Sequence, residues 1–131
     1  AGPGDFRPRT DPLMIRQTLI PAPMTRFEIR TTRRDEFVDV TDRVRTAVRD
    51  AGPGVAAVVV SSPHTTAGMT VQENADPDVV HDLLLWLDSR IPKDQPGFRH
   101  AEGNSDSHLK TMLVGTSVTS SSGGWSPTKA R

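Results

Sequence analysis

The sequence predicts an α+β domain, and three observations support this fold class. The chain has 131 residues, a length typical of a single domain that can bury a sizeable core. The run Val55–Val60 is short, wholly apolar and rich in β-branched residues, as in a central strand covered on both faces. Pro77–Arg90 carries apolar residues at helical spacing, so we expect a helix that packs on the sheet.

Composition and charge exclude several classes of protein. The formal net charge is zero and there is no cysteine, so a global basic field, disulfides, thiolate zinc sites and cysteine nucleophiles are excluded. No apolar run approaches the ~20 residues of a membrane span. The arginines between Arg26 and Arg49 are interleaved with acidic residues, which favours a solvated face. We therefore expect a cytoplasmic protein with neither a nucleic-acid nor a membrane partner.

The first part of the chain predicts two strands and a helix. Residues 1–12 are rich in Gly, Pro and charge, and we interpret them as disordered or introduced by cloning. Leu13–Ile20 is predicted as a short strand, and the alternation over Arg26–Thr32 predicts a half-buried one. A helix with Asp39 or Thr41 as its N-cap should follow and end before Gly-Pro.

The second part predicts two further strands around two helices. Met69–Gln72 is a candidate strand. Asp76 is a good N-cap and Pro77 suits the first helical position, with Val80, Leu83, Leu84 and Leu87 forming the apolar stripe of that helix. Asn104 or Ser105 should cap a short helix through Leu113, and Thr116–Thr119 should start the last strand.

The stretch Ser61–Asp78, which reads SSPHTTAGMTVQENADPD, gathers polar groups between the expected central strand and the long helix. His64 follows the end of that strand, where functional groups are often presented. Glu73 and Asp76 add two carboxylates nearby. Two plainer interpretations stay open: Asp76 is only a helix cap, and His64 is only a loop histidine.

The stretch His100–Lys110, which reads HAEGNSDSHLK, has the same character. It opens a short helix whose free N–H groups and positive dipole end favour an anion, and His108 and Lys110 could complete a phosphate pocket. Asp106 and Lys110 are four apart, so an ordinary ion pair on the helix surface is the alternative. His100 and His108 could instead share a metal with a carboxylate of Ser61–Asp78. We expect the two stretches to face each other across one site.

Read together, these motifs resemble the YjbQ-like family, also described as secondary thiamine-phosphate synthases. The resemblance rests on HTTAG, QENADPDV, HAEGNSDSHLK and GTSVT, and it covers roughly Pro21–Thr119. It implies a compact α+β domain with a mixed β-sheet and a homotrimer with sites near the subunit contacts. It also implies a weak activity that joins a hydroxymethylpyrimidine diphosphate to a thiazole phosphate and releases pyrophosphate, so the expected partner is a small phosphorylated molecule.

The resemblance also implies roles for individual residues. The expected catalytic residues are His64, Glu73, Asp76 and His108, and the expected ligand-binding residues are Thr65, Thr66, Asn74, Asn104, Asp106 and Lys110. A divalent metal, zinc or magnesium, would be held by His64, His100 and His108. The alternative function is a metal- or phosphate-ligand-binding regulatory module that uses the same pocket without turnover.

The chain departs from the family pattern at its end. Members usually continue with an apolar strand, a Gly-Thr-Trp-Gln segment and a basic C-terminus, whereas this chain reads SSSGGWSPTKAR from Ser120. We therefore divide the chain into residues 1–12, a YjbQ-like domain over residues 13–119, and a divergent polar tail over residues 120–131. The departure bears on the last strands and on the trimer contacts they would make.

Overall fold

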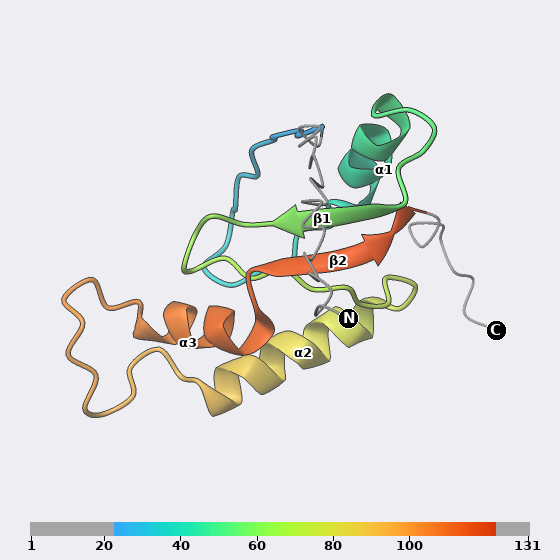
Figure 1. The fold of residues 1–131 in the computed structure, drawn as a ribbon. Helices are drawn as coiled ribbons and strands as arrows, with labels where there is room; N and C mark the ends of the chain where they lie inside the picture. The colour runs from blue at the N-terminus through green and yellow to red at the C-terminus, as the bar shows by residue number, and fades with distance from the viewer. Residues whose placement is uncertain (1–22, 123–131) are drawn as a thin grey trace, which may run out of the picture.

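The computed structural model describes residues 23–122, which form a small α+β domain (Figure 1). The elements in chain order are α1 (Thr41–Asp50), β1 (Ala57–Ser61), α2 (Pro77–Arg90), α3 (Ser105–Val114) and β2 (Ser117–Ser121). The expected strand at residues 13–20, the segment 1–12 and the tail from residue 123 lie outside the described residues. The predicted fold class is confirmed.

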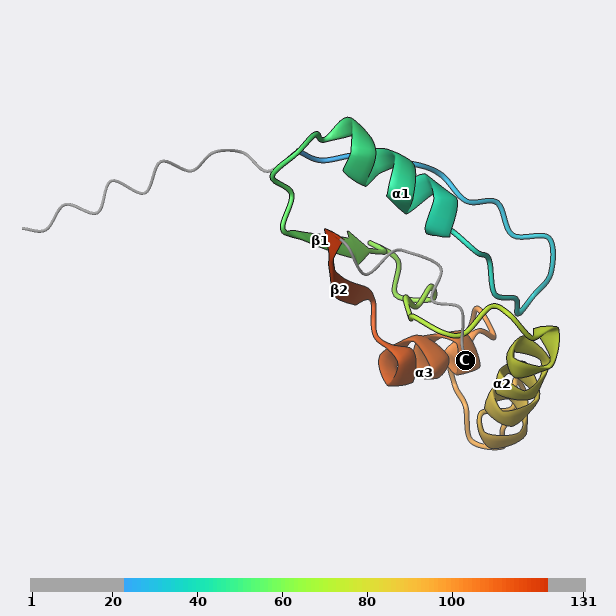
Figure 2. The same cartoon turned by 90° about the vertical axis from the view of Figure 1, so that its right-hand side faces the viewer.

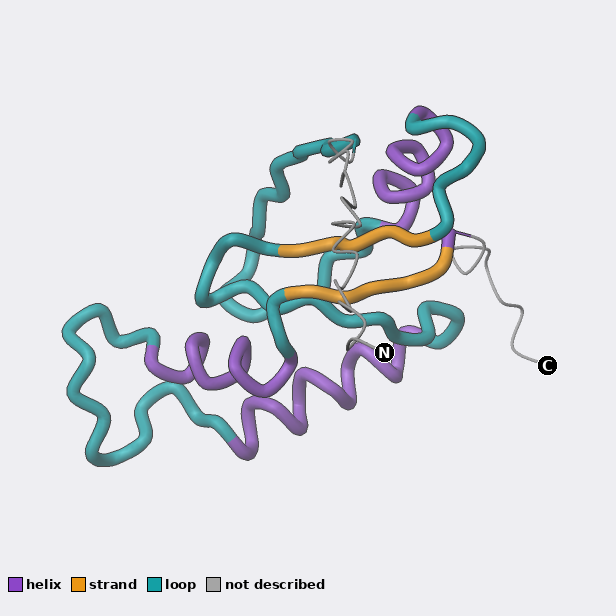
Figure 3. The backbone as a smooth tube through the Cα atoms, viewed as in Figure 1, coloured by secondary structure: helices purple, strands orange, loops and turns teal. Residues whose placement is uncertain are grey.

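The sheet consists of β1 and β2, which run antiparallel with Val59 opposite Thr119 (Figure 3). In both views α1 lies beyond the β1 side of the sheet, and α2 and α3 lie beyond the β2 side (Figures 1 and 2). We expected a mixed sheet with a central strand buried on both faces, and this was wrong for the described residues. β1 has a single antiparallel partner, its residues alternate in exposure, and Val59 is 65% exposed.

Two segments predicted as strands are extended or irregular instead. Residues 26–32 form no strand ladder, although Phe27 is half-buried under the guanidinium of Arg43, which lies 5.5 Å from the ring centroid. Residues 69–72 form no strand either, and Met69 N–H donates a single hydrogen bond to Gly115 O at 2.8 Å. The alternating pattern of residues 26–32 correctly predicted an extended backbone. A strand also needs a neighbouring strand whose backbone N–H and C=O groups are free to pair with it.

The helix boundaries follow the sequence closely. α2 begins at Pro77 after Asp76, whose Oδ1 accepts from Asp78 N–H at 2.9 Å. α1 begins at Thr41, and the carboxylate of Asp39 accepts from the Thr41 N–H at 2.8 Å. α3 ends at Gly115, whose φ of 92° suits glycine far better than any residue with a side chain. These caps satisfy backbone groups that a helix cannot satisfy itself.

The apolar core of the described part is thin. Within residues 23–122, Val44 is the apolar side chain that is buried, at 2% exposure. The stripe of α2 that includes Leu84 is only half-buried, and Leu85 and Trp86 on the same helix are exposed. No helix in this part of the chain is long and apolar enough to cross a membrane. Polar contacts, more than apolar packing, therefore hold α2 and α3 against the remainder of the domain.

Candidate functional site

The loop after β1 is held firmly against the junction of α3 and β2. Ser62 N–H donates to Thr116 O and Met69 N–H donates to Gly115 O, each at 2.8 Å. Between these two anchors Gly68 lies so close to the junction that a Cβ there would come within 2.9 Å of Val114 Cγ1. Glycine permits this approach because it has no side chain.

Three predicted site residues lie on this anchored loop with exposed side chains. His64, Thr65 and Thr66 are all exposed. The backbone N–H of His64 donates to Ser62 Oγ at 3.2 Å, and its carbonyl accepts from Ala67 N–H at 3.5 Å. The backbone is therefore fixed while the imidazole and the two hydroxyls face solvent, which leaves them available to a ligand.

The segment before α2 contains a helix cap and an anchored amide. Asp76 caps α2 as described above, which supports its plainer interpretation, although only Oδ1 is used. Asn74 Nδ2 donates to Asp39 Oδ2 at 2.6 Å. Glu73 is exposed. Asn74 is thus tied to a part of the chain 35 residues away, which the motif alone did not indicate.

The second polar stretch brings two histidine rings together. His100 and His108 contact edge to face, with ring centroids 5.5 Å apart. His100 Nε2 lies 3.8 Å from Glu102 Oε2, and the other neighbour of that carboxylate is Asn104 Nδ2 at 3.1 Å. Asn104 Oδ1 is buried and has no hydrogen-bond partner among the described residues. A buried acceptor of this kind is costly unless a donor reaches it.

An ion cluster formed by Arg34, Asp35, Asp88, Asp106 and Lys110 joins three parts of the chain. Asp106 is fully buried, and its two oxygens each lie 2.8 Å from the guanidinium of Arg34. Lys110 Nζ lies 2.6 Å from Asp88, 3.0 Å from Asp35 and 3.4 Å from Asp106. Two positive and three negative side chains give the cluster a formal charge of about −1, counted from their ordinary ionisation.

The pKa values of the ion cluster reflect these contacts. Desolvation is the largest effect on Lys110 and would lower its pKa, but hydrogen bonds to Asp88 and Asp35 outweigh it and raise the pKa. Desolvation would likewise raise the pKa of Asp35, but Lys110 and Arg34 lower it overall. Both groups are therefore held more firmly in their charged forms.

These contacts bear on the roles expected of Asp106 and Lys110. The ammonium of Lys110 has three donors and three carboxylates around it, and its side chain is only 11% exposed. Lys110 would have to exchange partners to bind a phosphate. The ion-pair interpretation of the Asp106–Lys110 spacing is borne out, but the pair is buried in a larger cluster rather than lying on a helix surface.

The segment Arg34–Asp39 lies between the two polar stretches and bonds to both. Arg34 and Asp35 contact α3 through Asp106 and Lys110, and Asp39 contacts Asn74. The turn that aims Arg34 is fixed because Glu36 accepts hydrogen bonds from the N–H groups of Thr32 and Arg33. Among the described residues, no hydrogen bond or ion pair joins side chains of Ser61–Asp78 directly to those of His100–Lys110.

Sequence reasoning missed Arg34, Asp35, Asp39 and Asp88 as neighbours of the candidate site. The arginines of this region were interpreted as a solvated face. Asp39 was considered only as the N-cap of α1, but Val40 occupies that position, and the Asp39 carboxylate accepts from the Thr41 N–H from one residue before it. Because these contacts join residues 22 to 75 positions apart, no local spacing could reveal them.

The metal expectation fits poorly within one chain. No group of three or more histidine and carboxylate side chains is placed to hold a metal ion within residues 23–122. Zinc and magnesium sites need at least this many protein ligands or a bound phosphate. His64, His100 and His108 as a metal set therefore remain a prediction, and no chemical step below is assigned to a metal.

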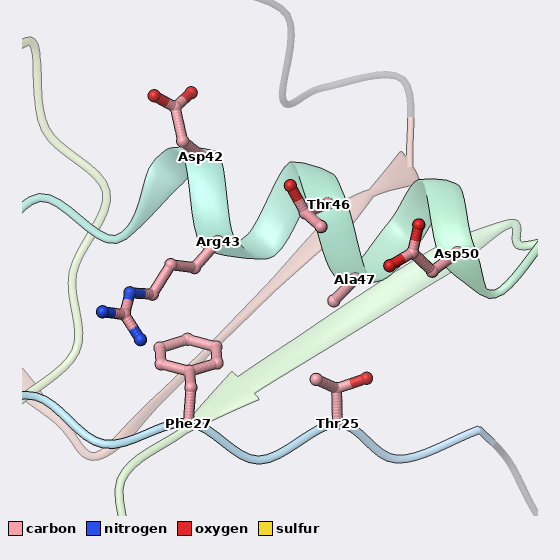
Figure 4. A pocket seen from close by; sticks show the side chains of 7 residues that line it. All are labelled: Thr25, Phe27, Asp42, Arg43, Thr46, Ala47 and Asp50. Carbon is pink, nitrogen blue, oxygen red and sulfur yellow. The ribbon is translucent and has the colours of Figure 1, made fainter.

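The hollow in Figure 4 lies elsewhere. It has a volume of about 360 Å³ and lies between the extended segment with Thr25 and Phe27 and the face of α1 that carries Arg43, Thr46 and Ala47. It contains none of the predicted site residues, so it does not form part of the candidate site.

Comparison with known proteins places the chain in a family. The family model described as "UPF0047 protein YjbQ-like" matches residues 25–121. A UPF0047 protein of Methanocaldococcus jannaschii is 45% identical over 94 residues, which is 72% of this chain and 67% of the relative. UPF0047 protein YugU of Bacillus subtilis is 43% identical over 91 residues, covering 70% of this chain and 69% of YugU.

Solved structures show the same relationship. The crystal structure of an uncharacterised conserved protein of the YjbQ/UPF0047 family from Clostridium acetobutylicum has a TM-score of 0.68 at 44% identity, covering 71% of each chain. A conserved hypothetical protein from Thermus thermophilus has a TM-score of 0.60 at 43% identity, covering 64% of each chain. Sequence and structure agree, and the chain belongs to the YjbQ-like UPF0047 family.

Proposed function

We propose that the protein is a weak transferase of the secondary thiamine-phosphate synthase type. It would join a hydroxymethylpyrimidine diphosphate to a thiazole phosphate and release pyrophosphate. The observation that carries this proposal is the anchored loop, which presents His64, Thr65 and Thr66 with free side chains on a fixed backbone. Fixed donors facing solvent suit a ligand with many phosphate oxygens.

The reaction needs charge stabilisation more than a covalent nucleophile. The ring nitrogen of the thiazole phosphate forms a bond to the methylene carbon of the pyrimidine with its own electron pair. The bond between that carbon and the diphosphate oxygen breaks, and the oxygen keeps the bonding pair. Pyrophosphate leaves with the negative charge, and the thiazole ring becomes a cation. The protein would therefore contribute most by stabilising the departing pyrophosphate.

The residues divide into those free to act and those that hold the site together. His64, Thr65 and Thr66 would donate to the diphosphate, and the free N–H groups at the start of α3 would add a positive dipole end. Asn104 Oδ1 is buried without a partner among the described residues, so it would serve the site as an acceptor only after the start of α3 shifts to expose it. Asp106 and Lys110 would position α3 through the ion cluster.

The alternative is a regulatory module that binds a phosphorylated ligand without turnover. One observation favours it: the charges of Asp106 and Lys110 are balanced inside the protein, which leaves fewer charged groups to lower a reaction barrier. Both functions use the same side chains, so turnover has to separate them.

A turnover assay with binding in parallel tests the proposal. The full chain is incubated with the two substrates, and pyrophosphate and thiamine phosphate are measured by chromatography. We expect slow formation of both products in equal amounts and a loss of at least tenfold in His64→Ala. His81→Ala is the matched control, because His81 is an exposed histidine on α2 whose ring pairs with the adjacent Asp82.

Thermal unfolding in the presence of each substrate gives the second readout. Stabilisation without product would favour the regulatory module. Absence of both stabilisation and product would contradict both functions. Equal activity in wild type, His64→Ala and His81→Ala would show that the reaction does not use this loop.

The family resemblance also leads us to propose a homotrimer. Large apolar side chains are exposed on several elements of the single chain, among them Val59, Leu85, Trp86, Met112 and Leu113. Large apolar side chains left exposed in a single chain are candidates for subunit contacts. Sedimentation equilibrium at several concentrations should give three times the monomer mass, and a monomer at every concentration would contradict the proposal.

A further inference from the structure

The side chain of Asp39 holds two parts of the chain at once. Its Oδ1 accepts from the Thr41 N–H at 2.8 Å at the start of α1, and its Oδ2 accepts from Asn74 Nδ2 at 2.6 Å. Asn74 belongs to the motif before α2 and is one of the expected ligand-binding residues. Asp39 therefore sets the orientation of the amide of one of the predicted ligand-binding residues.

Only one of the two possible orientations of the Asn74 amide is favourable. An ionised carboxylate accepts hydrogen bonds and cannot donate them, so the group that Asn74 turns toward Asp39 must be its NH₂. Hydrogen bonds from the hydroxyl and backbone N–H of Thr41, with a further bond from Asn74, lower the pKa of Asp39. The carboxylate is thus ionised at neutral pH, and a flipped amide would place oxygen against oxygen.

Fixing the nitrogen also fixes the oxygen. The other end of the amide, Asn74 Oδ1, makes no hydrogen bond to any described residue, and the side chain is exposed. The negative charge of Asp39 lies beside the amide nitrogen, where it disfavours a phosphate oxygen. Arg45 also faces Asp39, but its guanidinium is paired with Asp42 at 2.8 Å.

We propose that Asp39 is a specificity-determining residue that presents Asn74 Oδ1 as a fixed acceptor, so the ligand group bound there is a hydrogen-bond donor rather than a phosphate. An amino group on a heterocyclic ring has the required chemistry. Asp39 acts through Asn74 and need not touch the ligand itself. This inference rests on the proposed function, because it specifies which end of the pyrimidine substrate lies at Asn74.

Side-chain NMR tests the orientation without any ligand. The Asn74 amide protons should exchange slowly and resonate downfield in the wild type, and Asp39→Asn should abolish both effects. That variant can still accept from Thr41 N–H through its side-chain oxygen, so α1 keeps its cap. Asp42→Asn is the matched control, since it removes a carboxylate from the first turn of α1, three residues after Asp39, without touching Asn74. Fast exchange in the wild type would overturn the fixed orientation.

Binding of two substrate analogues tests the specificity. The probes are the pyrimidine diphosphate with a ring amino group and the same compound with a methoxy group in its place, which cannot donate. By calorimetry we expect the wild type and Asp42→Asn to prefer the amino compound about tenfold, the effect of one hydrogen bond to a fixed acceptor. In Asp39→Asn the preference should fall below about threefold, because the neutral amide tolerates both orientations of Asn74.

The outcomes separate this inference from the proposed function. Equal affinity of the wild type for both probes, no detectable binding of either probe, or an unchanged preference in Asp39→Asn would each overturn the role of Asp39. A clear preference without any product in the turnover assay would support that role and contradict the transferase.

Discussion

The two polar stretches look alike in sequence but differ in what their side chains contact. In Ser61–Asp78, the side chains of His64, Thr65 and Thr66 are exposed on an anchored loop. In His100–Lys110, Asp106 is buried and Lys110 is surrounded by carboxylates. A dense cluster of polar residues in a sequence can therefore be one of two things. It can be a set of groups free to bind a ligand, or a set of groups that bind one another.

The comparison is tested most severely by removing the buried carboxylate. Asp106→Ala removes the fully buried one of the two carboxylates that Arg34 and Lys110 share, leaving Asp35 as the other. We expect a loss of about 3–5 kcal/mol in the free energy of unfolding, the range for breaking a buried ion pair. Urea denaturation measures it. Asp88→Ala is the control, because Asp88 is 58% exposed at the outer end of the ion cluster and should cost below about 1 kcal/mol. Equal losses would show that burial does not distinguish the two ends.

Truncating the α2 stripe tests whether apolar packing contributes comparably. Leu84 is half-buried in the single chain, so Leu84→Ala should cost about 1–2 kcal/mol, below the range for a fully buried leucine. Leu85→Ala is the matched control, since Leu85 is 61% exposed on the next position of the same helix. A loss above about 3 kcal/mol for Leu84→Ala would instead indicate that another subunit covers this face.

The pH dependence of stability sharpens the comparison further. The pKa of Lys110 is raised from 10.5, so its contribution is present below that value and lost as the pH rises through the raised pKa. The pKa of Asp35 is lowered from 3.8, so its contribution is present above that value and lost as the pH falls through the lowered pKa. We expect the urea midpoint to fall at both extremes.

Lys110→Met should remove the decrease of the urea midpoint at alkaline pH, so that the midpoint of this variant stays nearly constant in that range. Lys93→Met, on the exposed loop after α2, should keep it. An alkaline fall of the same size in both variants would assign it to groups outside the ion cluster.

The smallest effect on stability is expected at the free groups. His64→Ala should change the free energy of unfolding by less than about 0.5 kcal/mol, because the side chain is exposed. If the two stretches form one site, His64→Ala and His108→Ala should each weaken pyrophosphate binding, and the double variant should lose less than the sum. Strictly additive losses measured by calorimetry would indicate two separate polar loops.

Local signals predicted the helices well and the sheet only in part. Asp76-Pro77 placed the start of α2, and the Gly after the third helix placed its end, because caps act within one turn of chain. The alternation at residues 26–32 predicted an extended backbone but not its lack of a partner. The same limit applies to the candidate site, where His64 was identified from its position after a strand and Asp39 was not linked to Asn74.

The sequence by itself determined the α+β class, the helix boundaries and the two polar stretches, because these depend on local spacing and composition, and its motifs carried the resemblance to the family. Only the tertiary structure decided that Arg34 and Asp35 contact α3, that Lys110 is neutralised from three sides, and that Asp39 orients Asn74. The physical reason is that a charge or an amide is satisfied by whichever group lies within about 3 Å of it, and distances between residues far apart in the chain arise only when the chain folds.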